Sequence, residues 1–239
     1  MIPIDIARLR RAFPDRTIHY YESIDSTMTA ATGLPIGDVV LAEEQTAGQG
    51  RHGHSWHSAA GDGIYCSLVL PQTPLLTLAL GLATHTAIFE ATGLVCDLRW
   101  PNDLMLADRK VAGILVQAVG GNAIAGIGIN VNHADFPADV AALATSLRLA
   151  GGRALHREDI LLALLPAIDA IVVQEKSAIL ASFTHLSSYA SGRRVEVQLP
   201  EGMLEGTTVG LNPDGFLIVR RRDGTDTLVV AGGVRAARS

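Results

Sequence analysis

Between residues 95 and 131, short apolar segments follow one another with only brief turns between them, and this pattern constrains the fold more than any other feature of the sequence. The strand-like segments are 95–100, 105–107, 110–117 and 123–131. Asp108-Arg109 and Gly121-Asn122 supply two of the turns. Links this short join antiparallel neighbours, because a parallel connection needs about a dozen residues or more. The pattern therefore predicts a largely antiparallel sheet at the centre of the molecule.

The tail repeats this pattern after a change of composition near Ser187. Its predicted strands, rich in Val, Leu and Ile, are 192–199, 203–211, 215–222 and 226–231. Strong turn signals separate them: Leu199-Pro200-Glu201-Gly202, Asn212-Pro213-Asp214-Gly215 and Asp223-Gly224. We therefore expect two domains, a main α+β domain over 1–187 and a small β-barrel over 188–239.

Outside these two regions, strand and helix signals alternate. We expect further strands at 18–22, 39–43 and 64–70, and helices at 4–13, up to Thr32, at 73–92 and over 157–185. Thr73-Pro74 opens the long helix and Gly93 ends it, while Pro166 kinks or divides the last helical region. The expected fold class is α+β, a mixed and largely antiparallel sheet flanked by helices, with a small C-terminal β-barrel.

Composition excludes several broad classes of protein. Hydrophobic residues make up 48% and charged residues 18% of the chain, which supplies a sizeable core and excludes wholesale disorder. The net charge of -5 argues against a general nucleic-acid binder, which carries basic surface. The start of the chain lacks the apolar core of an export signal, and the longest apolar run, 75–82, is far shorter than the roughly 20 residues of a membrane span. We expect a cytoplasmic globular protein in which Cys66 and Cys96 are reduced, buried thiols.

The stretch 42–58 follows a predicted strand and places Gly48, Gly50 and Gly53 around Arg51. Glycines allow successive N–H groups to converge on an anion, and an arginine adds a forked charge that suits phosphate. The spacing is neither that of a P-loop nor that of the dinucleotide fingerprint. Three nearby histidines lack an acidic or cysteine partner at a spacing typical of metal sites. Composition alone leaves two readings open here, an anion-binding loop and an ordinary surface loop.

A second candidate stretch runs from Arg99 to Asp103, with Lys110 after the next turn. The chain has 17 arginines and two lysines, so a retained lysine hints that a compact ammonium is needed there. Asp103 suits a single-carboxylate Mg²⁺ site, although Pro101 also favours plain turn-forming roles for Asn102 and Asp103. The glycines of 126–132 indicate either a close backbone approach or a weakened strand.

Taken together, these motifs resemble those of biotin–protein ligases, which attach biotin to a lysine of carboxylase carrier domains. Five segments carry the resemblance in the family's order: Glu22 to Thr27, Ala42 to Trp56, Trp100 to Leu104, Arg109 to Gln117 and Gly126 to Asn130. Residues 209–238 also look like the family's SH3-like barrel. The resemblance implies the biotinyl/lipoyl ligase fold, similar to class II aminoacyl-tRNA synthetases.

The resemblance also implies a reaction in two steps. Biotin and MgATP give biotinyl-5′-AMP and pyrophosphate, and a lysine of a biotin carboxyl carrier domain then attacks the mixed anhydride. The implied cofactors are ATP and Mg²⁺, and the implied partner is a biotin carboxyl carrier protein, with no nucleic acid and no membrane. Because the chain shows no room for a helix-turn-helix before residue 20, we expect a ligase without operator binding, either a monomer or a homodimer.

Site roles carry over residue by residue. Lys110 and Arg51 match the catalytic positions, and Lys110 would bridge the biotin carboxylate and the α-phosphate. The implied biotin site is Ser26, Thr27, Gln45, Gly48, Gln49, Gly50, Arg51, Lys110 and Gly113. The implied ATP site is Arg51, His54, Trp56, Asn102, Asp103, Lys110, Asn130 and Arg238. Asp103 would also bind the metal, and Arg235 is an alternative to Arg238.

Two loop positions depart from the family pattern, because Gln49 and His54 stand where relatives usually have arginine. Gln117 likewise replaces the more usual glutamate. An imidazole in water is mostly neutral at pH 7, so we expect weaker ATP binding or slower adenylation than in a three-arginine loop.

Three alternatives stay open. A lipoate or octanoate ligase shares the fold and also activates a carboxylic acid. A non-catalytic binding module with a decayed site would retain the fold without turnover. A nucleic-acid-binding tail would use Arg220-Arg221-Arg222, although such a run also suits a solvated strand end.

Overall fold

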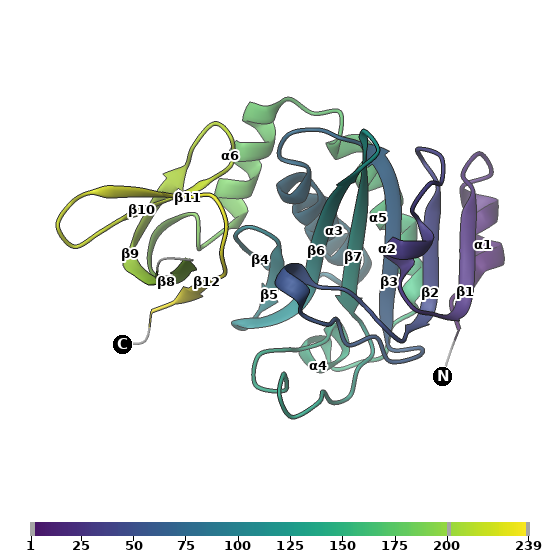
Figure 1. Cartoon of the computed structure of the whole chain (residues 1–239). Helices are drawn as coiled ribbons and strands as arrows, with labels where there is room; N and C mark the ends of the chain where they lie inside the picture. Colours follow the sequence, from purple (N-terminus) through teal and green to yellow (C-terminus); the bar gives the residue numbers. More distant parts are fainter. Residues whose placement is uncertain (1–2, 200–201, 238–239) are drawn as a thin grey trace.

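A computed structural model describes residues 3–199 and 202–237, and its main feature is a seven-stranded mixed sheet (Figure 1). The strands are β1 (Ile18–Ile24), β2 (Val39–Gln45), β3 (Gly63–Pro71), β4 (Asp97–Arg99), β5 (Asp103–Leu106), β6 (Arg109–Val119) and β7 (Asn122–Asn130). They lie in the order β1-β2-β3-β7-β6-β5-β4, and β1 with β2 is the parallel pair. The expected antiparallel meander from β4 to β7 is therefore confirmed.

The turns of this meander are tight, as the sequence predicts. Ala107 and Asp108 join β5 to β6 with φ values of 48° and 58°, and Gly120 and Gly121 join β6 to β7 with φ values of 58° and 85°. Consecutive left-handed residues give the hairpin twist that suits neighbouring antiparallel strands. The first turn brings Lys110, at the start of β6, close to the beginning of β5.

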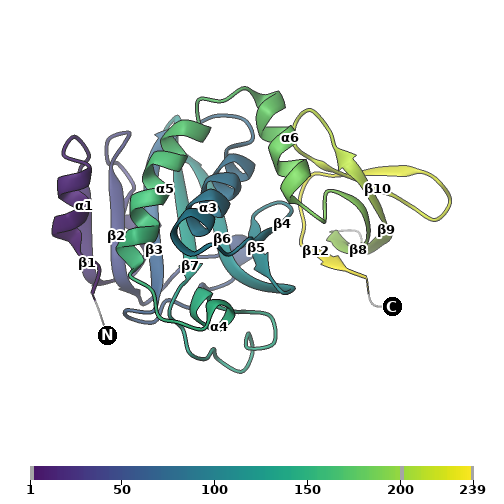
Figure 2. The same cartoon turned by 180° about the vertical axis from the view of Figure 1, so that it is seen from behind.

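One face of the sheet is covered by helices α3 (Leu76–Thr92) and α5 (Arg157–Ile171), with α6 (Lys176–Leu186) beside them (Figure 2). Helix α3 lies deepest, and most of its residues are buried on all sides. The short helix α1 (Ile6–Ala12) lies beyond β1 and contacts α5. Within the described residues, the opposite face carries the short helix α2 (Thr27–Ala30), the single 3-10 turn η1 (Arg51–Gly53) and loops, so it is the open face of the sheet (Figure 1).

Strand β3 is buried on both faces, because each face packs against a different apolar cluster. Ile64, Cys66 and Leu68 face the main core under α3 and α5. Val69 belongs to a smaller cluster with Met28 of α2 on the open face. The strand expected at 64–70 is therefore confirmed, and both of its faces are interior.

Three helical features differ from expectation. The long helix begins at Leu76, and not at Thr73-Pro74, because Leu75 before it adopts a left-handed conformation with φ of 63°. Pro166 lies inside a continuous α5, and the break between helices comes after Ile171. A further short helix, α4 (Leu147–Gly151), was not predicted; Ser146 caps it by accepting a hydrogen bond from the N–H of Leu149 at 3.0 Å.

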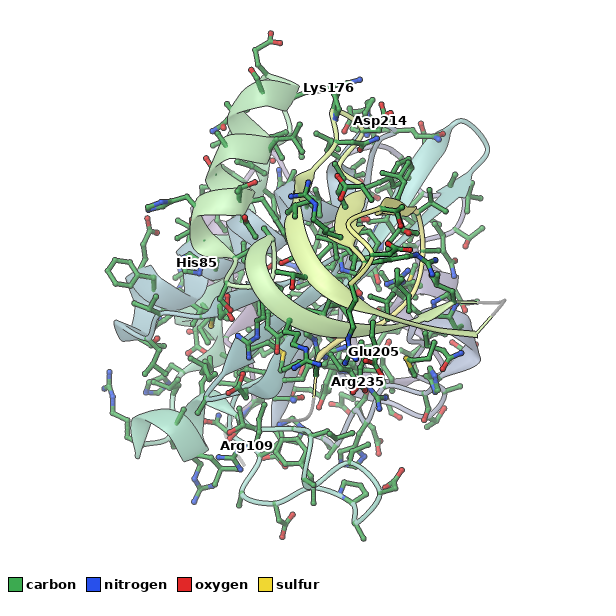
Figure 3. All side chains as sticks on the ribbon, turned by 90° about the vertical axis from the view of Figure 1, so that its left-hand side faces the viewer. His85, Arg109, Lys176, Glu205, Asp214 and Arg235 are labelled. Carbon is green, nitrogen blue, oxygen red and sulfur yellow. The ribbon has the colours of Figure 1, made fainter. Side chains whose placement is uncertain are left out.

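The tail forms a separate antiparallel sheet of five strands in the order β11-β10-β9-β8-β12, which faces the viewer in Figure 3, where Glu205 and Arg235 are labelled on it. Its strands are β8 (Ser191–Leu199), β9 (Gly202–Leu211), β10 (Leu217–Arg220), β11 (Asp226–Val229) and β12 (Val234–Ala236). Strand β12 was not predicted; it pairs with β8. The Trp100 indole N–H donates to the Gly215 carbonyl at 2.8 Å, which ties this sheet to the main domain.

Two further expectations concern buried thiols and membrane spans. Cys66 and Cys96 are free and buried, and burial raises the pKa of each thiol to about 12. Within 3–199 and 202–237, every helix is too short or too polar to cross a bilayer.

Candidate active site

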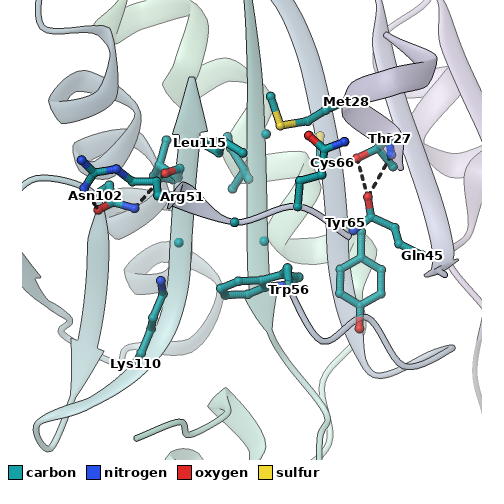
Figure 4. Close-up of a pocket in the computed structure, with 17 residues that line it drawn as sticks. Thr27, Met28, Gln45, Arg51, Trp56, Tyr65, Cys66, Asn102, Lys110 and Leu115 are labelled. Carbon is teal, nitrogen blue, oxygen red and sulfur yellow. Dashed lines mark hydrogen bonds between the residues drawn. The ribbon is translucent and has the colours of Figure 1, made fainter. Parts of the chain in front are cut away.

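The open face of the large sheet carries a pocket (Figure 4). It is formed by α2, the ends of β2 and β3, the glycine-rich loop at 48–56, and β6 and β7. Most of the predicted site residues line it: Thr27, Gln45, Gln49, Gly50, Arg51, Trp56, Asn102, Lys110 and Gly113. Residues without a predicted site role also line it: Met28, Tyr65, Cys66, Ile114, Leu115 and Ile127. Gly126 and Gly128, for which the sequence left a close approach open, line it as well. Segments more than 80 residues apart in the chain thus form one site.

Parallel pairing of β1 with β2 creates the first end of the pocket. The two strands end side by side, with Ile24 opposite Gln45, so the residues that follow β1 lie beside the end of β2. The N–H of Thr27 donates to Gln45 Oε1 at 2.8 Å, and its hydroxyl donates to the same atom at 3.0 Å. Both residues were predicted, and the sheet register explains why they meet.

Two serines extend this polar end. Gln45 Nε2 donates to Ser58 Oγ at 2.9 Å, and the Thr27 hydroxyl lies 2.8 Å from Ser67 Oγ. The Ser26 hydroxyl is buried and has no hydrogen-bond partner within the described part of the chain. This end therefore offers neutral donors and acceptors, which suit an uncharged polar group of a ligand.

The floor of the pocket is a set of glycines on β6 and β7. Gly113 lies opposite Gly128, and Leu115 lies opposite Gly126. A Cβ at Gly128 would lie 2.4 Å from Trp56, and one at Gly126 would lie 2.8 Å from Met28. Of the two readings of these glycines, the close approach is therefore correct: side chains from other segments rest on the bare backbone.

Charged groups gather at the second end of the pocket. Lys110 Nζ lies 2.5 Å from Asp103 Oδ1, and Arg99 Nη2 donates to Asp103 Oδ2 at 2.6 Å. Burial alone would raise the pKa of Asp103, but the charges of Lys110 and Arg99 and their hydrogen bonds hold it below its usual value. The carboxylate is therefore ionised across the physiological pH range.

Arg51 reaches the same end from the glycine-rich loop. Its Nη1 donates to Asn102 Oδ1 at 2.9 Å, and Asn102 Nδ2 donates to the Ile114 carbonyl at 3.0 Å. Burial lowers the pKa of Arg51, and the negative charge of Asp103 opposes that shift. Asn102 thus links a loop cation to β6, a role beyond turn formation.

The backbone around Lys110 is held from both directions. Its N–H donates to the Leu143 carbonyl at 2.7 Å, and its carbonyl accepts from the Thr145 N–H at 2.9 Å. The amide of Asn130 donates to the Thr145 carbonyl at 3.1 Å. Asn130 is buried behind this segment and supports the Lys110 backbone, and it does not line the pocket.

The glycine-rich loop folds back on itself over the sheet. The N–H of Gly50 donates to the His54 carbonyl at 2.7 Å, and the N–H of Trp56 donates to the Gly48 carbonyl at 2.9 Å. The side chain of His54 is exposed and outside the pocket lining, while Trp56 turns inward with Lys110 Nζ 5.2 Å from its ring centroid. Arg238, assigned to ATP by resemblance, lies outside the described residues.

Several contributing residues escaped the sequence analysis. Ser58 and Ser67 carry no local signal, since their partners lie 13 and 40 positions away. Arg99 was named at the start of the candidate stretch up to Asp103, but no role was predicted for it. The arrangement as a whole suits a ligand that is neutral and polar at one end and anionic at the other.

Comparisons with known proteins agree with this arrangement. The Biotin/lipoate A/B protein ligase family model matches residues 20–133, and the Biotin protein ligase C terminal domain model matches residues 190–233. The bifunctional ligase/repressor BirA of Bacillus subtilis is 32% identical over 229 residues, covering 86% of this chain and 70% of that protein. The biotin–[acetyl-CoA-carboxylase] ligase of Mycobacterium tuberculosis is 34% identical over 223 residues, covering 87% of this chain and 82% of that protein.

A solved structure gives the same result for the fold. Biotin protein ligase from Aquifex aeolicus, in complex with biotin and ATP, matches with a TM-score of 0.82 and 29% identity, covering 93% of this chain and 99% of that one. The chain belongs to the biotin protein ligase family and is a ligase.

Proposed function

We propose that this ligase activates biotin with ATP to biotinyl-5′-AMP and transfers the biotinyl group to a lysine of a biotin carboxyl carrier protein. The observation that carries the proposal is the two-ended pocket, with Thr27 and Gln45 at one end and Arg51 and Lys110 at the other. Biotin has matching ends, a neutral ureido ring and a carboxylate.

The neutral end accounts for recognition of the ring. Gln45 and Thr27 supply amide and hydroxyl groups, and the buried Ser26 hydroxyl has unused hydrogen-bonding capacity. A ligand that left such groups unpaired would lose about 1–3 kcal/mol for each. The backbone of Gly48, Gln49 and Gly50 would close over the ring from the loop.

The charged end accounts for activation. When the biotin carboxylate attacks the α-phosphorus of ATP, two anions approach each other and charge grows on the phosphoryl oxygens. The ammonium of Lys110 and the guanidinium of Arg51 stabilise that charge, and a group of this kind contributes on the order of 3 kcal/mol. A new C–O–P bond forms, the α–β phosphoanhydride bond breaks, and pyrophosphate leaves.

Trp56 and Asn102, which line the pocket, would contact the nucleotide. His54 would approach it only from the exposed side of the loop, and Asn130 would act from behind by supporting the Lys110 backbone. Asp103 would hold Mg²⁺, which neutralises phosphate charge when bound. A single carboxylate fits this ion, because Mg²⁺ in nucleotide sites takes its remaining ligands from phosphate oxygens and water.

In the second step, the amine of the acceptor lysine attacks the acyl carbon of the anhydride. The acyl C–O bond breaks, AMP leaves with the electron pair, and the amine loses a proton to give the amide. We propose that the acceptor is a carrier domain of a carboxylase, and that the ligase acts as a monomer or homodimer in the cytoplasm. The two free buried cysteines suit a reducing compartment.

Exchange of pyrophosphate into ATP, measured with an added carboxylic acid substrate, tests the first step. Biotin, lipoate and octanoate are compared as that acid on the purified protein. Exchange with biotin alone supports the proposal, and exchange with lipoate would assign the chain to lipoate ligation. Lys110→Ala should abolish exchange. Lys176→Ala, which removes the chain's other lysine from the exposed start of α6, should leave it unchanged.

A further inference from the structure

Arg99 does not line the pocket, yet it shares a carboxylate with the pocket lysine. It ends β4 directly opposite Asp103, the first residue of β5, so strand pairing fixes the two side chains together. Arg99 occupies Oδ2 and Lys110 occupies Oδ1 of the same carboxylate. All three side chains are largely buried, with 21%, 15% and 29% of Arg99, Asp103 and Lys110 exposed.

Lys110 is fixed through its backbone more than through its ammonium. Hydrogen bonds to Leu143 and from Thr145 hold its backbone, whereas the side chain ends in a single contact with Asp103 and faces the ring of Trp56. To stabilise charge on biotin and ATP, the ammonium has to leave Asp103 and turn to the substrate oxygens. The cost of that movement depends on what remains beside the carboxylate.

We infer that Arg99 is a positioning residue, which keeps Asp103 paired while the Lys110 ammonium moves from Oδ1 to the substrate. With Arg99 present, the carboxylate retains one charged partner throughout. Without it, departure of Lys110 would leave a largely buried carboxylate with no cationic side chain beside it until Mg²⁺ binds, which is strongly unfavourable. Lys110 would then stay on Asp103, with both oxygens open to it. This inference rests on the proposed function for the role of Lys110.

Chemical labelling tests the hold on Lys110 independently of the reaction. The chain has two lysines, so reductive methylation followed by peptide mass spectrometry compares Lys110 with Lys176 as an internal standard. Arg99→Gln should slow methylation of Lys110 relative to Lys176 at least threefold, because the ammonium is held more tightly. Asp103→Asn should speed it, and adding Arg99→Gln to Asp103→Asn should change nothing further. An unchanged or raised ratio in Arg99→Gln alone would overturn the inference.

Kinetics supply the second readout. Arg99→Gln should lower kcat for biotin-dependent exchange about tenfold while KM for biotin stays within about twofold, the pattern of an interaction needed only on the way to the transition state. Arg99→Lys should restore most of the rate, because it restores the charge. Arg109→Gln is the matched control: it removes an exposed arginine next to Lys110 (Figure 3), and should change neither readout.

The two proposals fail in different ways. Absence of exchange with biotin in the unaltered protein would count against the proposed function, and labelling would still decide the role of Arg99. Equal changes in kcat and KM for biotin in Arg99→Gln, unrepaired by Arg99→Lys, would show a general loss of structure and overturn the inference.

Discussion

Gly113 on β6 and Gly128 on β7 lie directly opposite each other, and the indole of Trp56 rests on both. A Cβ would lie 3.0 Å from the ring at Gly113 and 2.4 Å from it at Gly128. Close-packed interiors do not absorb such overlaps without moving atoms. The position of the glycine-rich loop over the sheet therefore depends on two missing side chains in strands that follow it in the chain.

Gly128→Ala should push Trp56 off the sheet floor. The expected results are a red shift of tryptophan emission, as the indole meets water, and a rise in KM for ATP of about tenfold. Fluorescence spectra and exchange kinetics measure the two effects. Gly233→Ala is the control, since a Cβ there meets nothing within 4 Å. Unchanged emission in Gly128→Ala would show that the indole does not lie against Gly128 in solution.

Gln45→Ala should weaken biotin binding selectively. It removes the acceptor of both Thr27 donors and leaves them buried, so KM for biotin should rise about ten- to a hundredfold. KM for ATP should stay within about twofold, because the change lies at the neutral end of the pocket. Gln117→Ala, an exposed glutamine on β6, is the control. A rise in KM for ATP equal to that for biotin would contradict the assignment of the two ends.

His54→Arg should tighten ATP binding. The position is exposed on the loop that carries Arg51, and a permanent charge there adds a phosphate partner that a neutral imidazole does not supply. KM for ATP should fall by about threefold at low ionic strength and less at high salt, where exposed charges are screened. His52→Arg, also exposed, controls for added charge alone. An unchanged KM for ATP would refute this prediction.

The free energy of unfolding should decrease as the pH is lowered, because of His133. Burial lowers the pKa of His133 from 6.5 to about 4. The charges of Asp62 and Asp135 oppose this shift, whereas that of His57 adds to it. Between these values the unfolded chain binds the proton and the folded chain does not. Stability is therefore fully present above pH 6.5 and is lost as the pH falls toward 4, by up to about 1.4 kcal/mol per pH unit.

Urea unfolding at pH 7.0 and pH 5.0 measures this loss. His133→Phe, which keeps an aromatic ring beside Phe136, should show a smaller difference between the two pH values than the unaltered protein. Equal differences in the two proteins would assign the pH dependence to other groups.

Local signals in the sequence predicted the elements whose causes are local. The β4–β7 meander and its turns were predicted to within a few residues, because two-residue turns have strong residue preferences. The start of α3 was not, because Leu75 takes a left-handed conformation while its side chain packs against the turn at Gly215, far along the chain. Pro166 is typical of a helix break, but α5 continues through it, and its neighbours Leu165 and Ile168 are buried in the core.

The site residues likewise divide into those with a local sequence signal and those that depend on long-range pairing. Motif residues such as Thr27, Gln45 and Lys110 were placed by resemblance, and the structure brings them to one pocket. Their hydrogen-bonding partners Ser58 and Ser67 were not, because only the sheet register brings them near. Arg99 became visible as a partner only once β4 was paired with β5.

The two ends of the pocket stand on opposite sides of the β3–β7 pairing, which joins the strands before residue 72 to the later meander. A molecule that reaches from Gln45 to Lys110 thus crosses the β3–β7 pairing and links the strands on its two sides. Part of its binding free energy opposes local opening of the sheet there, so backbone amides of β3 and β7 exchange more slowly in the complex. We therefore expect the middle of the sheet to be held most tightly while a ligand spans the pocket and to loosen once that ligand has left.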